Sequence, residues 1–258
     1  AAHTDAKYAY PRRGGWAVRL WWGRLALLVL LAAVLAAMPA LWLERPAAEA
    51  MGGVDRPCVA LTFDDGPRVS TTPLLLEGLS QRGVHATFFV IGDSVDGCEE
   101  LLQRMAGEGH QIGVHSQSHQ MLTGLSAGEL DREVGALRRT LTALLGEEDL
   151  MLRPPYGMVD NALLRRVDMP IILWSVDPMD WSDRNTDREV AEIVSQVKDG
   201  DIILLHDIYN ASVEAALRVV DALMARGFYF VTVEELFAIQ GVEPQPGHVY
   251  RRLPPESG

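Results

Sequence analysis

Short apolar runs alternate with longer amphipathic stretches between about residue 55 and residue 240. The runs are apolar throughout, which is typical of strands buried on both faces in a parallel sheet. The stretches between them have helical spacing, and several are followed by a glycine where a last helical turn would end. We expect strands at 58–63, 86–91, 111–115, 151–154, 171–175, 201–206 and 228–233.

Two of the expected helices begin with a recognisable signal. Ser126 with Glu129, and Thr186 with Glu189, match the S/T-x-x-E pattern of a capping box. Strands separated by helices imply an α/β fold in which helices cover a parallel sheet. Seven such units favour a distorted, incomplete (β/α)7-type barrel, whose functional side chains belong at the carboxyl ends of the strands. The proline-containing segment from Val242 onward is expected to be loop.

A different pattern precedes this domain. Leu25 to Leu43 is apolar and uncharged, long enough for one transmembrane helix. Four arginines precede it and one follows, which predicts that the N-terminus stays cytoplasmic and the domain lies outside. A cleaved signal peptide is the alternative, because small residues follow the run. The chain then divides into a basic cytoplasmic tail (1–24), an anchor or signal peptide (25–43), a linker (44–54), the α/β domain (55–241) and a C-terminal tail (242–258).

Charge narrows the range of partners. The whole chain has a formal net charge of -12, and residues 55–258 hold 17 basic against 32 acidic side chains, a balance of -15. A domain this acidic repels nucleic acid and anionic membrane surfaces, so a neutral or cationic substrate suits it better. Cys58 and Cys98 fall at opposite ends of neighbouring strands, so we expect them to be unpaired. We expect a monomer.

Polar side chains gather where two of the predicted strands end. Asp64 and Asp65 end the first strand before a Gly-Pro turn, although such a motif alone could be an ordinary acidic turn. His115 and His119 end the third strand, and imidazoles four residues apart can grip one metal ion. A lone histidine is more often structural, but two at this spacing reverse that preference. With one aspartate they form a two-histidine, one-carboxylate set that leaves a position open for water.

Three further strand ends carry weaker signals. Arg153 could hold a carboxylate by a bidentate pair. After it, two prolines leave the backbone N–H of Tyr156 as a donor that can point at a ligand. The loop Asp177–Trp181 holds two acids and an aromatic ring, and a buried strand delivers His206 to the same rim.

Together these segments resemble the polysaccharide deacetylases, carbohydrate esterase family 4, whose catalytic unit is the NodB homology domain. The resemblance covers about residues 58–235. Its five motifs are TFDDGP (62–67), HSQSH (115–119), RPPYG (153–157), DPMDW (177–181) and IILLH (202–206). It implies a metal-dependent hydrolase that removes N-acetyl groups from a polysaccharide.

The resemblance also implies roles for individual residues. Asp65, His115 and His119 would bind one divalent metal, for which zinc is expected and cobalt or nickel are alternatives. Asp64 would be the general base for the attacking water, and His206 the general acid for the leaving amine.

The remaining matched positions would orient these groups and line the pocket. Arg153 would orient Asp64, and Asp180, in preference to Asp177, would tune Arg153 or His206. The residues implied to contact substrate are Tyr156, through its N–H, and Pro155, Trp181 and Leu204. The family often has Lys or Arg directly after the tryptophan of the fourth motif. Here Ser182 follows and Arg184 lies two residues further on, a departure that bears on the shape of one groove wall and not on the chemistry.

An outward-facing, membrane-tethered domain suggests a cell-wall substrate. We therefore expect deacetylation of N-acetylglucosamine-type residues in peptidoglycan, with an O-acetyl xylan esterase or a chitooligosaccharide deacetylase as alternatives. A glycan-binding module without activity is disfavoured, because no member of the implied catalytic set is missing.

Overall fold

The computed structural model describes residues 56–254. The expected cytoplasmic tail, membrane segment and linker lie outside these residues and stay predictions. Among residues 56–254, no helix has the length and apolar character needed to cross a membrane.

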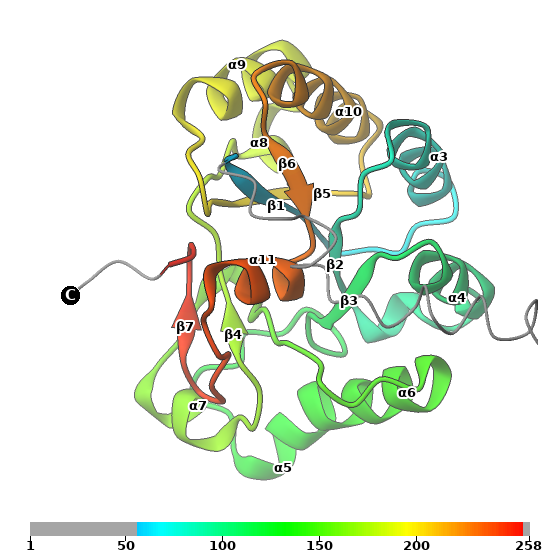
Figure 1. Ribbon diagram of the computed structural model, residues 1–258. Coiled ribbons are helices and arrows are strands. Elements are labelled where there is room, and N and C mark those ends of the chain that lie inside the picture. The colour runs from blue at the N-terminus through cyan, green and yellow to red at the C-terminus, as the bar shows by residue number, and fades with distance from the viewer. Residues whose placement is uncertain (1–55, 255–258) are drawn as a thin grey trace, which may run out of the picture. The chain divides into compact units, whose positions relative to one another are not determined.

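The core of the domain is a five-stranded parallel sheet in the order β3-β2-β1-β5, in which β6 pairs with the first half of β1 (Figure 1). Single bridges continue this wall from β3 through Leu152 to Ile171, and from Val176 to β5. The arrangement is consistent with the distorted barrel expected from the sequence. The strands are β1 (Cys58–Asp64), β2 (Thr87–Val90), β3 (Gln111–Val114), β4 (Ile171–Ile172), β5 (Ile202–His206), β6 (Tyr229–Val231) and β7 (Val249–Tyr250).

Helices surround these strands (Figure 1). They are α3 (Thr72–Arg82), α4 (Glu99–Gly107), α5 (Ala127–Leu130), α6 (Ala136–Leu145), α7 (Asn161–Arg166), α8 (Asp180–Asp183), α9 (Thr186–Gln196), α10 (Asn210–Ala225) and α11 (Val233–Gln240). Short 3-10 turns lie at Gly92–Ser94 and Pro155–Gly157, and a π-helical turn lies at Asp131–Gly135.

The two faces of β1 point into two apolar clusters. Val59, Leu61 and Phe63 pack in the larger cluster with the surrounding helices, whereas Cys58 and Ala60 pack in a smaller one. This alternation follows from the two-residue period of a strand. The smaller cluster is completed by side chains of α11 and the C-terminal segment, including Phe237, Tyr250 and Leu253.

The structure corrects three expectations about elements. The run 151–154 is no strand, because Leu152 forms only single bridges and prolines without N–H groups follow it. The run 171–175 is a strand only at Ile171–Ile172, because the carbonyls of Ile172 and Leu173 accept hydrogen bonds from a side chain instead. The segment after Val242 is not all loop: β7 pairs with β4, a contact too distant in the sequence to predict from local pattern.

The two predicted capping boxes differ in outcome. The box of Ser126 and Glu129 is confirmed. At the other helix the prediction was wrong, since Asn185 is the N-cap and accepts from the N–H of Arg188. Glu189 instead lies fully buried, with no hydrogen-bond partner for either carboxylate oxygen among residues 56–254. The expectation that Cys58 and Cys98 are unpaired is confirmed.

The packing of the C-terminal segment against Gly200 can be tested by mutation. Its φ is +80°, and a Cβ there would lie 1.5 Å from the backbone oxygen of Leu253. We expect Gly200→Ala to lower the free energy of unfolding by about 2–4 kcal/mol in chemical denaturation, since both backbone strain and overpacking oppose it. Gly107→Ala is the control, because a Cβ at Gly107 meets open space. Equal stability of the two variants would contradict the docking of Leu253.

The buried histidine His110, which contacts β2, makes the stability of the fold depend on pH. Its ring is buried against Phe88, and its Nδ1 accepts a hydrogen bond from the N–H of Ala86. Burial, reinforced by neighbouring His85, lowers the pKa of His110 from an ordinary 6.5 to about 4. Between these pH values only the unfolded chain takes up the proton, so stability falls as the pH drops from 6.5 to 4.

We expect His110 to account for about 3 kcal/mol of that loss. In His110→Asn an amide oxygen can replace the acceptor without titrating. The free energy of unfolding of both proteins is measured in urea from pH 7 to pH 4. As the pH falls, the unaltered protein should lose stability relative to His110→Asn. Parallel pH profiles would show that the imidazole is not held neutral.

Candidate active site

A cavity of about 450 Å³ opens at the carboxyl ends of β1, β3 and β5, as expected for this class of fold. Eight of the predicted site residues line it, and two further ones, Trp174 and Asp177, complete the wall. The lining residues are Asp64, Asp65, His115, His119, Tyr156, Trp174, Asp177, Trp181, Leu204 and His206. The other predicted residues, Arg153, Pro155 and Asp180, are buried directly behind this surface.

The three predicted metal ligands lie together. One ligand atom from each of Asp65, His115 and His119 falls within 4.8 Å of the others. Asp65 Oδ1 is 3.5 Å from Nε2 of His115 and 3.4 Å from Nε2 of His119. This oxygen is buried and has no hydrogen-bond partner among residues 56–254, so a cation would satisfy it.

The protonation states also suit a cation. Burial alone would raise the pKa of Asp65, but the surrounding histidines hold it below its ordinary value. Burial lowers the pKa of His119, which favours the neutral imidazole that ligation requires. The Nδ1 of His115 lies 2.7 Å from the carbonyl oxygen of Arg153, which orients the ring. These residues therefore fit a divalent metal ion.

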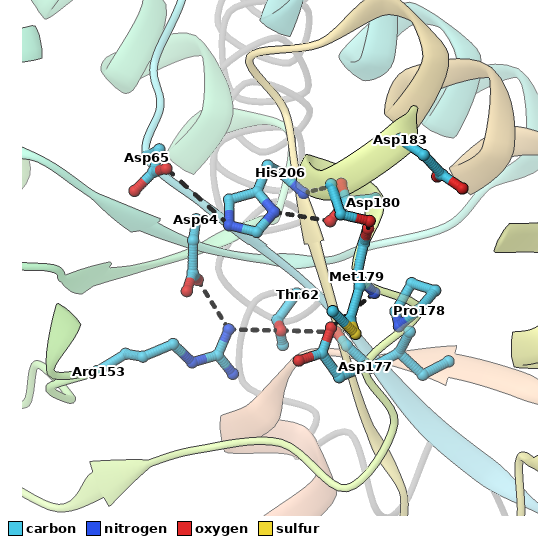
Figure 2. Close-up of polar contacts among 12 residues, drawn as sticks. Thr62, Asp64, Asp65, Arg153, Asp177, Pro178, Met179, Asp180, Asp183 and His206 are labelled. Carbon is cyan, nitrogen blue, oxygen red and sulfur yellow. Dashed lines mark hydrogen bonds and ion pairs between the residues drawn. The ribbon is translucent and has the colours of Figure 1, made fainter. Parts of the chain in front are cut away.

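A buried ion pair holds Asp64. Arg153 is fully buried, and its Nη1 donates to Asp64 Oδ1 at 2.8 Å and to Thr62 Oγ1 at 2.7 Å (Figure 2). Its Nε and Nη2 donate to the carbonyls of Ile172 and Leu173, each at 3.1 Å. The guanidinium thus orients Asp64. The second carboxylate oxygen of Asp64, Oδ2, faces the metal ligands and lies 3.6 Å from Nε2 of His115.

A second pair holds His206. Asp180 is fully buried, and its Oδ1 lies 2.8 Å from Nδ1 of His206, while its Oδ2 accepts the backbone N–H of the same residue (Figure 2). Burial alone would lower the pKa of His206, but Asp180, Asp64 and Asp65 together raise it to about 9. The hydrogen bond to Asp180 favours the charged form of the imidazole. Its Nε2 points into the cavity, 3.9 Å from Asp65 Oδ2.

The loops of the third and fourth motifs form the rim. The ring of Tyr156 is exposed and packs edge-on against His119, with 4.7 Å between centroids. Its φ is 61°, and no backbone acceptor among residues 56–254 takes its N–H. Asp177 accepts the backbone N–H of Met179, whereas Asp180 is the acid of this motif that contacts His206, so the preference for Asp180 agrees with the geometry.

Two supporting carboxylates were not identified from the sequence. Asp207 is fully buried and accepts the hydroxyl of Thr72, which in turn accepts the N–H of Arg68 at 2.8 Å. Its carboxylate also occupies the space where a Cβ on Gly66 would lie. It therefore ties the loop after β1 to the loop after β5. Its position immediately after a buried strand was the available signal.

Glu133 is the second. It accepts both the N–H of Ser118 at 3.0 Å and its hydroxyl at 2.9 Å, and so fixes the loop just before His119. It lies in the π-helical turn, a local irregularity often found near functional sites. Nothing in its spacing from the histidine motif marks it, because the contact is tertiary.

Comparison with known proteins points to polysaccharide deacetylases. The family model for polysaccharide deacetylases matches residues 52–169. Among relatives, a peptidoglycan-N-acetylmuramic acid deacetylase of Bacillus subtilis is 41% identical over 69% of this chain. The chain spans only 38% of the length of that relative.

Other matches extend over most of both chains. A peptidoglycan-N-acetylglucosamine deacetylase of Bacillus cereus is 33% identical over 77% of this chain and 75% of its own length. A solved structure of a deacetylase called T48, with substrate, is 39% identical and covers 77% of this chain and 100% of its own, with a TM-score of 0.73.

Metal binding is testable directly on the purified protein by calorimetric titration with zinc. We expect His119→Ala to weaken zinc binding at least about 100-fold, since a lost ligand should cost more than an outer-shell change. His85→Ala is the control, because its ring contacts His110 outside the cavity. Zinc affinity that is unchanged in His119→Ala would rule out this ligand set.

Proposed function

This chain belongs to the polysaccharide deacetylase family, and we propose that it is a metal-dependent hydrolase that removes N-acetyl groups from peptidoglycan. Its family is one of hydrolases that act on amides. One observation carries the proposal: the cavity unites a carboxylate held by a buried arginine, a carboxylate-histidine ligand set, and an imidazole held by a second carboxylate.

The reaction cleaves the amide C–N bond and yields acetate and a free sugar amine. A divalent cation on Asp65, His115 and His119, for which we propose zinc, would supply Lewis-acid polarisation of the carbonyl and of water. Asp64, fixed by its ion pair, accepts a proton from the attacking water. His206 donates a proton to the leaving nitrogen, and Asp180 stabilises the imidazolium form until then.

The backbone and the pocket wall complete the site. The N–H of Tyr156 is a donor for the negative charge that develops on the carbonyl oxygen. Loss of one such donor typically costs about 2.7–4 kcal/mol of barrier. Leu204, almost fully buried on β5, and Trp181 give the acetyl methyl an apolar surface. We propose that this small apolar wall limits the acyl group to acetyl.

Peptidoglycan is proposed as the polymer because the relatives compared above are named as deacetylases of its two sugars. The uncharged run 25–43 and the arginines before it support an anchored, outward-facing domain, which we propose acts as a monomer.

The proposal is tested by acetate release from three substrates: peptidoglycan fragments, chitooligosaccharides and acetylated xylan. We expect release from peptidoglycan, its loss with a chelator, and recovery on adding zinc. Asp64→Asn should lower the rate about 10²- to 10⁴-fold, because general base catalysis is lost. Asp221→Asn is the matched control, since Asp221 pairs with Arg82 on the surface of α10.

Each other outcome has a definite meaning. Acetate release from xylan alone would replace the proposal with an O-acetyl esterase, and release from chitooligosaccharides alone with a chitooligosaccharide deacetylase. Binding of peptidoglycan fragments without acetate release from any substrate would leave a glycan-binding protein.

A further inference from the structure

An arginine lies beside the general acid. Arg184 directly follows α8, the helix that carries both Asp180 and Trp181. Its Cζ lies 4.2 Å from the centroid of the Tyr209 ring, which in turn lies 6.4 Å from the ring of His206. Arg184 is therefore placed just outside the cavity, two ring contacts from the imidazole.

The charge of Arg184 is not neutralised by its neighbours. The adjacent acid, Asp183, is already engaged by Arg188, with contacts of 2.7 and 2.9 Å, and Arg188 also pairs with Glu192. Within residues 56–254, no carboxylate lies within ion-pair distance of the Arg184 guanidinium. An exposed arginine beside several acids would ordinarily take one of them.

The backbone of Arg184 has an unusual conformation. Arg184 has a φ of 53°, a left-handed conformation that is uncommon outside glycine. Stacking on an aromatic face covers one side of the planar guanidinium and leaves its N–H edge available. That edge has the geometry for a bidentate pair with a carboxylate.

A second cation borders the same loop. Arg68 donates from Nη1 to the carbonyl of Ile208 at 3.1 Å. The segment from His206 to Tyr209 therefore has a guanidinium contact from the loop after β1 and another from the end of α8. Two guanidinium groups therefore flank this segment, in a domain whose net charge is negative.

We propose that Arg184 binds a carboxylate of the substrate and makes the protein selective for an anionic glycan. The carboxylate would belong to the same sugar as the reacting acetamide or to its neighbour, because Arg184 lies two ring contacts from His206. In peptidoglycan two groups supply it: the lactyl group of a muramyl residue and its attached peptide. This inference rests on the proposed function and names its preferred substrate.

The experiment compares kcat/KM for acetate release from three substrates. One is a neutral N-acetylglucosamine oligomer, one a muramyl oligomer with a free lactyl carboxylate, and one a muramyl oligomer with its peptide. We expect Arg184→Gln to lower kcat/KM about 10- to 100-fold on the substrate with the recognised carboxylate, mainly through KM, since a charged hydrogen-bonded pair is lost. On the neutral oligomer the change should be less than about twofold, because Arg184 touches no reacting group.

Two further variants separate recognition from structure. Arg184→Lys keeps the charge and should recover part of the loss. Arg165→Gln removes an equal charge from an exposed site on α7 and should change no substrate. An equal loss on all three substrates in Arg184→Gln would assign Arg184 a structural role and overturn the inference. So would a preference of the unaltered protein for the neutral oligomer.

Binding decides the matter independently of turnover. The same oligomers are titrated calorimetrically into Asp64→Asn protein, with and without Arg184→Gln. Weaker binding of only the anionic oligomers in the double variant supports the inference. This holds even if the unaltered protein releases no acetate, a result that would contradict only the proposed function. Equal binding by both proteins would overturn the inference while acetate release still upheld the proposed function.

Discussion

The buried pair of Arg153 and Asp64 is the interaction on which the rest of the site depends. Taking a guanidinium fully out of water costs several kcal/mol unless its hydrogen bonds are made elsewhere. Here Asp64, Thr62 and two carbonyls of the fourth strand segment supply acceptors for its Nε, Nη1 and Nη2. Those carbonyls are thereby withdrawn from strand pairing, which explains why β4 is short. The irregular wall of the barrel and the fixed position of Asp64 have a common cause.

The partners of Asp64 and Asp180 also distinguish the proposed base from the proposed acid. Asp64 is paired with a permanent cation, whereas Asp180 is paired with an imidazole whose pKa it raises, so in the proposed reaction the two carboxylates would support opposite proton transfers. Strain is concentrated in the same place. Within residues 56–254 the non-glycine residues with positive φ are Asp65, Ser116, His119, Tyr156, Met179 and Arg184. All of them lie in loops that carry the site, and backbone strain of this kind persists where function requires it.

The sequence predicted the parts of this site that depend on periodicity. Strand ends meet at one edge of a parallel sheet, so placing Asp65, His115 and His206 at strand ends was enough to bring them together. Pattern failed where a tertiary contact decided the outcome. Glu189 has the spacing of a capping residue, yet the helix begins one residue earlier than predicted, with Asn185 as its N-cap, and Glu189 lies buried in the first turn. Likewise, β7 pairs with β4 across a distance in sequence that no local signal spans.

Net charge alone does not determine the charge of the substrate. The balance of -15 over residues 55–258 favours a neutral or cationic substrate if the charge is treated as one uniform field. At physiological ionic strength, however, exposed charges beyond about 8 Å are largely screened. A group entering the cavity therefore responds to the side chains at its rim. There Asp180 is engaged by His206 and Asp183 by Arg188, while Arg184, stacked on Tyr209, has no carboxylate partner among residues 56–254. Under the proposed recognition by Arg184, an acidic domain would bind an anionic glycan through the side chains at the rim of its cavity.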